Sequence, residues 1–183
     1  ELLSFPQVDL VVRGEGEYIL KRLVLADSLS DIPGISYKKQ GKIVHNNDSQ
    51  LIQDLNQLPF PARHLRRHKY KNHMMSEKGR ERDVISFSRG CWGQCTFCCE
   101  PMMCGSHQRF RSPENIMDEL LDIVSFHKGR PLSIFVTDPN FLGSPTVIDK
   151  LCDLLHKYQL DIDFSVLIRA DSVVKNPALI AKM

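Results

Sequence analysis

A dipeptide of a polar residue followed by proline occurs three times in the second half of the chain, each 32 residues after the last. These pairs are Ser112-Pro113, Ser144-Pro145 and Asn176-Pro177. Each pair predicts a helix start, because the polar side chain can cap a backbone N–H and proline fits the first helical position. After the first two pairs, residues follow at the spacing of one helical face. After the first pair they are Ile116, Leu120, Ile123, Val124 and His127, and after the second Val147, Ile148, Leu151, Leu154, Leu155 and Tyr158.

Short apolar runs precede these helix starts, at Leu132 to Val136 and at Ile162 to Ile168, and a third run covers Val84 to Ser88. The two later runs are rich in β-branched residues and are typical of parallel strands buried on both faces. Strand–loop–helix units of this length build parallel α/β barrels and doubly wound sheets. Because an eight-unit barrel needs about 250 residues, three units predict an α/β chain that contains only the opening half of such a barrel.

Three cysteines follow the first predicted strand, at Cys91, Cys95 and Cys98. Three thiolates on one short loop can hold three irons of a 4Fe–4S cubane, which leaves the fourth iron open to activate a small molecule. Zinc is an alternative with Cys99 or Cys104 as fourth ligand, although structural zinc sites usually come as two separated pairs. A disulfide framework is a second alternative, but six cysteines in 183 residues are sparse for one.

The composition of the chain is that of a globular protein. A net charge of +2 and 42% hydrophobic residues exclude a disordered or strongly basic chain. No apolar stretch approaches the roughly 20 residues that span a bilayer, and no targeting segment stands out. We therefore expect a cytoplasmic protein with no membrane partner. The chain starts at Glu1 and stops at Met183 inside a predicted helix, so we expect both ends to be cut from a longer protein.

The run RGCWGQCTFC, residues 89–98, resembles the signature of the radical S-adenosylmethionine enzymes. The resemblance implies that Cys91, Cys95 and Cys98 ligate a 4Fe–4S cluster whose open iron binds the amine and carboxylate of S-adenosylmethionine. An electron from the cluster, which an external donor supplies, then breaks a sulfur–carbon bond, and the resulting radical takes hydrogen from a substrate. Phe97 resembles an aromatic residue that lies against the adenine, with ordinary packing as the alternative. The pattern assigns no role to Cys99 or Cys104.

Barrel enzymes place functional residues at the C-terminal ends of strands. The TDPNF turn after the second predicted strand is similar to a DDNF-like turn of the same family, with Pro139 replacing the second acid. The resemblance implies that Asp138 and Asn140 help to hold S-adenosylmethionine, and that Arg169 faces its carboxylate in a bidentate pair. The alternatives are turn formation for Asp138 and a salt bridge to Asp171 or Asp138 for Arg169.

The first 30 residues contain a predicted strand, Val8 to Val12, then RGEGE and an amphipathic helix. The apolar positions expected on that helix are Tyr18, Leu20, Leu23 and Val24. The stretch VDLVVRGEGE resembles the end of the cobalamin-binding domain of class B radical enzymes. The family's axial histidine motif, D-x-H-x-x-G, would lie upstream of Glu1, so the resemblance leaves open whether cobalamin binds.

The next segment predicts a hairpin that turns near Gly41. This hairpin and the later LPFPAR stretch resemble the family linker. The resemblance thus implies three parts. They are the tail of a Rossmann-like cobalamin-type domain at 1–30, a linker with a hairpin at 31–78, and the N-terminal half of a partial (βα) barrel at 79–183.

Two arginine-containing stretches suggest anion contacts. Arg109 and Arg111 precede a predicted helix in a stretch similar to the R-x-RSPENI sequence of the cobalamin-dependent branch. They predict an anion site, with a solvated helix start as the alternative. The basic stretch Arg63 to His73 predicts a solvated linker, with phosphate contact as the alternative.

The resemblance implies an enzyme that abstracts hydrogen from a small-molecule substrate, leading to methyl transfer or cyclisation. One alternative is a radical methylthiotransferase acting on transfer RNA. That class normally carries further cysteines before the cluster motif, and none precedes Cys91, so we do not expect nucleic acid as a partner. The other alternative is a non-catalytic module stabilised by zinc or a cluster.

Overall fold

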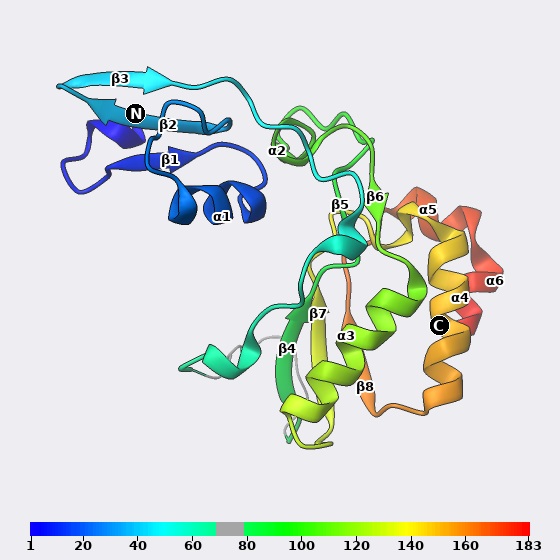
Figure 1. Ribbon diagram of the computed structural model, residues 1–183. Helices are drawn as coiled ribbons and strands as arrows, with labels where there is room; N and C mark the ends of the chain where they lie inside the picture. The colour runs from blue at the N-terminus through cyan, green and yellow to red at the C-terminus, as the bar shows by residue number, and fades with distance from the viewer. Residues whose placement is uncertain (69–78) are drawn as a thin grey trace. The chain divides into compact units, whose positions relative to one another are not determined.

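The computed structural model of the chain describes residues 1–68 and 79–183. It divides into two compact units (Figure 1). The first unit comprises residues 1–53 and 93–106, and the second comprises residues 54–92 and 107–183. The last part of the predicted linker, with Lys69, Lys71 and His73 of the basic stretch, lies outside the described residues.

The first unit contains an antiparallel sheet in the order β1 (Leu10–Val12), β2 (Ile35–Lys39) and β3 (Lys42–His45). β2 and β3 form the predicted hairpin, with Lys39 opposite Lys42. The two turn residues, Gln40 and Gly41, have φ of 50° and 75°. A two-residue turn with positive φ at both positions matches the right-handed twist of the flanking strands, so this local sequence directs the hairpin.

Helix α1 (Glu17–Leu25) begins where RGEGE predicts it, but its buried face differs from the expected one. Ile19 is the buried residue and packs with Leu23 against the sheet core. Tyr18, Leu20 and Val24 are exposed. The expectation is confirmed for Leu23 and wrong for the other three, because residues four apart on a helix, such as Ile19 and Leu23, share a face.

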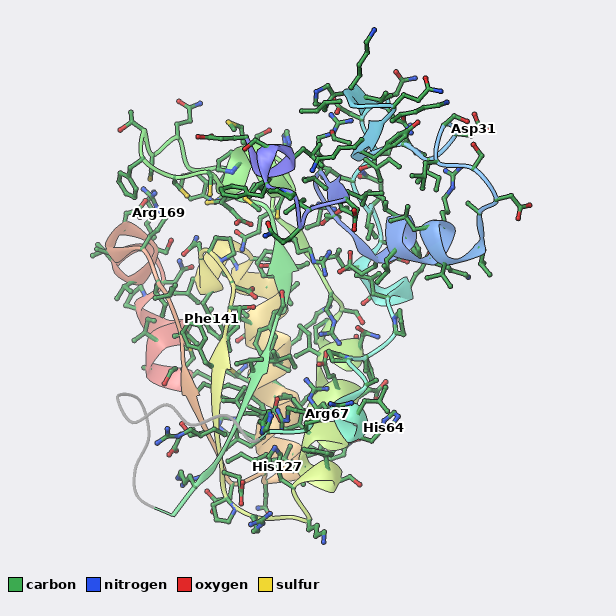
Figure 2. The ribbon with its side chains drawn as sticks, turned by 90° about the vertical axis from the view of Figure 1, so that its left-hand side faces the viewer. Asp31, His64, Arg67, His127, Phe141 and Arg169 are labelled. Atoms are coloured by element: carbon green, nitrogen blue, oxygen red, sulfur yellow. The ribbon has the colours of Figure 1, made fainter. Side chains whose placement is uncertain are left out.

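The second unit contains a parallel three-stranded sheet in the order β4 (Glu81–Ile85), β7 (Leu132–Val136) and β8 (Ile162–Ser165). The helices α3 (Pro113–Phe126) and α4 (Pro145–Tyr158) connect these strands and pack against each other. Both lie on the same side of the sheet (Figures 1 and 2). The α/β class and the successive strand–helix units are therefore confirmed.

Two strands end earlier than their apolar runs predict. β4 stops at Ile85, and the chain continues as β5 (Ser88–Arg89), which pairs antiparallel with β6 (Arg109–Phe110). β8 stops at Ser165 and is only partly buried, because it forms the edge of the sheet. The expected burial on both faces holds for the central strand β7 alone.

All three predicted helix starts are observed, but their capping differs. The Ser112 hydroxyl accepts the N–H of Asn115 at 3.1 Å, as expected for an N-cap. Ser144 makes no side-chain cap bond to α4. Before α6 (Pro177–Lys182), Asn176 instead donates to the Ser172 carbonyl at 2.8 Å. That carbonyl belongs to α5 (Ala170–Lys175), which ends immediately upstream.

The core of the second unit lies between the sheet and its two long helices. Its central residues are fully or almost fully buried: Ile116, Leu120, Ile123, Leu132, Ile134, Val136, Ile148 and Leu151. The predicted face of α3 is thus confirmed, with His127 ending the helix instead of continuing its apolar stripe. On α4, the expected apolar residue Tyr158 is 45% exposed, because it lies in the last turn.

The remaining elements are short. They are η1 (Leu2–Ser4), η2 (Leu55–Gln57), η3 (Arg63–Leu65), α2 (Glu100–Cys104) and η4 (Phe141–Gly143). None of the helices in the two described stretches has the length and apolarity to cross a membrane.

Candidate cofactor-binding site

Asp138 lies two residues beyond β7 and is fully buried. One carboxylate oxygen accepts the backbone N–H groups of Phe87 at 2.8 Å and Ser88 at 3.2 Å, and the other accepts the Ser88 hydroxyl. Burial raises the pKa of Asp138 to about 6, although these three donors act in the opposite direction. The carboxylate does not cap its own turn but binds the segment that leaves β4.

These bonds explain why the first predicted strand is interrupted. The N–H groups of Phe87 and Ser88 point to the Asp138 carboxylate, so they are not available to the ladder of the sheet. The Phe87 ring remains in the core, 5.8 Å from the ring of Phe141 between centroids. The end of β4 is therefore set by Asp138, which lies fifty residues from Ser88 in the sequence.

Gln108 joins the same hydrogen-bond network from the residue before β6. Its Nε2 donates to the Ser88 hydroxyl oxygen and to the Asn140 carbonyl, each at 2.8 Å. A Cβ atom at Gly143 would lie 1.8 Å from the Gln108 Oε1 atom, so glycine is needed for this placement. The role of Gln108 could not be predicted from the sequence, because a single glutamine outside any motif carries no local signal.

Asn140 and Arg169 meet at the ends of β7 and β8. Asn140 is fully buried, and its Oδ1 accepts the backbone N–H of Arg169 at 3.3 Å. Within the described part of the chain, the Asn140 Nδ2 atom is buried without a hydrogen-bond partner. An orphaned buried donor is uncommon and fits an acceptor atom on a ligand.

The Arg169 side chain is held on two sides. Its Nε donates to Asp171 at 3.0 Å, and its guanidinium lies 4.8 Å from the centre of the Trp92 ring. The hydrogen bond and charge of Arg169 lower the pKa of Asp171. The alternative expected for Arg169, a salt bridge to Asp171, is thus present, with 37% of the arginine side chain exposed. Figure 2 labels Arg169 just after the end of β8.

The second unit therefore brings Asp138, Asn140 and Arg169 together, as the positions of these residues after parallel strands predict. Their proposed contact with S-adenosylmethionine stays a prediction. Cys91 belongs to the same unit, one residue before Trp92, and is partly buried.

The rest of the cysteine loop, residues 93–106, belongs to the first unit. Cys95 and Cys98 are exposed thiols, and the N–H of Cys98 bonds to the Cys95 carbonyl at 3.0 Å. Phe97 is 92% exposed, so ordinary core packing does not account for it. Over residues 1–68 and 79–183, no three His, Cys, Asp or Glu side chains are gathered at metal-binding distance. The donor chemistry nevertheless fits iron, because soft thiolates are the ligands of iron–sulfur clusters.

The basic stretch predicted to be a solvated linker is partly buried, which corrects that expectation. The Arg63 side chain, only 5% exposed, bonds to Glu119 at 2.5 Å and to Asp83 at 3.4 Å. His127, labelled in Figure 2, approaches the second Asp83 oxygen at 2.8 Å. Burial acts to raise the pKa of Asp83, but His127, the Val84 N–H, Arg63 and Arg66 outweigh it, so the pKa is lowered.

The anion site predicted beside α3 is also corrected. The Arg111 guanidinium forms an ion pair with Glu119 and donates to the Ser86 carbonyl at 2.9 Å and the Asn115 side chain at 2.7 Å. Arg111 is 9% exposed, so the solvated helix start is wrong as well. The burial of Arg63 and Arg111 was not predicted, because their shared partner Glu119 lies in α3, where a charged side chain normally faces water.

No protein-family model matches the chain. An uncharacterized methyltransferase of Pyrococcus horikoshii is 36% identical over 149 residues, which cover 79% of this chain and 31% of that protein. The anaerobic magnesium-protoporphyrin IX monomethyl ester cyclase of Synechocystis is 26% identical over 182 residues, covering 96% of this chain and 34% of that protein.

A solved structure has a similar fold. The cobalamin-dependent S-adenosylmethionine radical enzyme OxsB, with aqua-cobalamin and S-adenosylmethionine bound, superposes with a TM-score of 0.66. The two are 25% identical, and the match covers 90% of this chain and 23% of OxsB. The chain is thus a partial match to cobalamin-binding radical S-adenosylmethionine enzymes, and it spans about a third of the length of its curated relatives.

Proposed function

We propose that this chain is the cluster-binding part of a radical S-adenosylmethionine enzyme, with Cys91, Cys95 and Cys98 as the ligands of a 4Fe–4S cluster. The observation that carries the proposal is the position of the cysteine motif in the fold. It begins six residues after β4 ends, on the loop that follows the first strand of a parallel sheet. Loops at this edge of such sheets carry the chemistry in α/β enzymes.

The bound cluster would supply the electron that cleaves S-adenosylmethionine to a carbon radical. The chain's own residues would hold and orient that ligand. Asn140 offers its unpartnered Nδ2 donor to a ligand acceptor. Arg169, steadied by Asp171 and Trp92, would face the ligand carboxylate, and the exposed Phe97 ring would contact the adenine.

We further propose that the chain divides into three parts. Residues 79–183 would form the N-terminal half of a partial (βα) barrel, because β4, β7 and β8 are parallel neighbours in chain order. Residues 1–30 would be the tail of a cobalamin-type domain, and residues 31–78 a linker. The relatives include a methyltransferase and a cyclase. We therefore propose hydrogen abstraction from a small molecule, followed by methyl transfer or cyclisation, with an external electron donor.

The test is anaerobic reconstitution of the chain with iron and sulfide. The wild-type protein should take up about four irons per chain. After reduction it should give a cubane electron paramagnetic resonance signal that changes when S-adenosylmethionine is added. Cys91→Ala, Cys95→Ala and Cys98→Ala should each lose this signal. Cys99→Ala is the matched control, because Cys99 is an exposed thiol of the same loop outside the motif, and it should load normally. A colourless chain with one tightly bound zinc would instead support the non-catalytic module.

A further inference from the structure

We propose that Ser88, Gln108 and Asp138 form a clamp that holds both ends of the cysteine loop, and that these three are positioning residues for the cluster. This inference rests on the proposed function. Asp138 was predicted as a contact of S-adenosylmethionine, whereas Gln108 and Ser88 carry no recognisable signature in the sequence.

The loop that carries the cysteines is closed at its base. It leaves through β5 and returns through β6, and these strands pair with Ser88 opposite Phe110 and Arg89 opposite Arg109. Ser88 stands three residues before Cys91, and Gln108 stands immediately before β6. The two clamp residues on the loop therefore mark its entry and its exit.

A continuous series of hydrogen bonds joins these two points to the turn after β7. Asp138 accepts the N–H and hydroxyl of Ser88, and the same hydroxyl oxygen accepts from Gln108. Gln108 also donates to the carbonyl of Asn140. The Ser88 hydroxyl thus acts as donor and acceptor at once, which joins the entry, the exit and the turn.

Burial makes this arrangement specific. Ser88 is 2% exposed, and Asp138 is fully buried. In such surroundings water cannot replace a lost partner, so a broken bond leaves an unsatisfied polar group. The loop between the clamped ends contains only α2, a helix of five residues, as regular structure. The points at which the loop starts and ends are therefore fixed mainly at its base.

Gly143 offers a way to disturb the clamp without removing any hydrogen-bonding group. A Cβ atom there would lie 1.8 Å from Oε1, 2.5 Å from Cδ and 2.9 Å from Nε2 of Gln108. Gly143→Ala should therefore displace the Gln108 carboxamide. Gln108→Ala removes the same group directly, so the two substitutions should act on one interaction and their effects should not add.

The experiment measures iron per chain and the electron paramagnetic resonance signal of the reduced cluster, with and without S-adenosylmethionine, alongside thermal unfolding. Gln108→Ala and Gly143→Ala should each lower cluster occupancy several-fold, and the double variant should be no worse than either. Asp138→Ala should behave alike. Asp138→Asn should lose less cluster than Asp138→Ala, because its carbonyl still accepts both N–H groups while the Ser88 hydroxyl proton loses its carboxylate acceptor. Ile148→Val, in the core of the same unit, is the control for lost stability.

The outcomes separate the two proposals. If the wild-type chain loads a cubane and the Gln108 and Gly143 variants load equally well, the clamp is refuted and the proposed function stands. The clamp is equally refuted if these variants lose cluster only in proportion to a stability loss that Ile148→Val reproduces. If the wild-type chain itself takes up no cubane, both proposals fail together.

Discussion

The Asp138 carboxylate and the Ser88 hydroxyl form a buried hydrogen bond between residues fifty positions apart in the sequence. Two backbone N–H groups, from Phe87 and Ser88, bond to the same carboxylate. This contact joins the ends of two neighbouring parallel strands and sets the point from which the cysteine loop departs. It also makes the protonation of Asp138 a determinant of stability.

The first prediction concerns that protonation. Burial raises the pKa of Asp138 from 3.8 to about 6, so the folded state favours the neutral acid. Its stabilising contribution is complete below pH 3.8 and is lost as the pH rises through 6. The free energy of unfolding of the wild type relative to Asp138→Asn should therefore fall by about 3 kcal/mol between these limits. Urea denaturation from pH 4 to 7 measures the difference, and a curve that rises with pH would contradict it.

The second prediction concerns the buried charge of Arg63. Without this guanidinium, the buried carboxylates of Glu119 and Asp83 each lose one ion-pair partner. Arg63→Ala should lower the free energy of unfolding by about 3–5 kcal/mol. Arg67→Ala provides the matched control, because Arg67 lies in the same basic stretch but is exposed, and it should change stability by less than about 0.5 kcal/mol. Equal effects for the two would refute the buried network.

The third prediction compares two serines in equivalent positions of the 32-residue repeat. Ser112 caps α3 through its hydroxyl, whereas Ser144 precedes α4 without a side-chain cap bond. Ser112→Ala should destabilise the protein by about 1 kcal/mol. Ser144→Ala should have a much smaller effect on the midpoint of thermal unfolding. The reverse order would show that α4, not α3, depends on its cap.

The fourth prediction concerns ligand binding by Asn140. Its Nδ2 atom is a buried donor without a partner in the described chain, and a ligand acceptor would satisfy it. Asn140→Ala should weaken the binding of S-adenosylmethionine to the reconstituted protein about tenfold, equal to roughly 1.4 kcal/mol. Titration of the ligand-induced change in the cluster signal measures this. Unchanged affinity, with normal iron content, would remove Asn140 from the binding site.

Much of the secondary structure followed from short stretches of sequence. The serine–proline and asparagine–proline pairs marked the three helix starts, because the restricted φ of proline acts within one turn, and Ser112 adds a side-chain cap. Gly41 marked the hairpin, because glycine adopts a positive φ without strain. The parallel direction of the strands also followed, since a helix between two strands returns the chain in the same direction.

The spacing of Cys91, Cys95 and Cys98 was equally a property of the sequence, because all three stand on one short loop. Only the tertiary structure decided which polar residues are buried. Arg63, Arg111 and Gln108 have ordinary local surroundings, and their partners lie on other elements of the fold. A buried charge is stable only when an opposite charge reaches it, and folding alone determines whether one does.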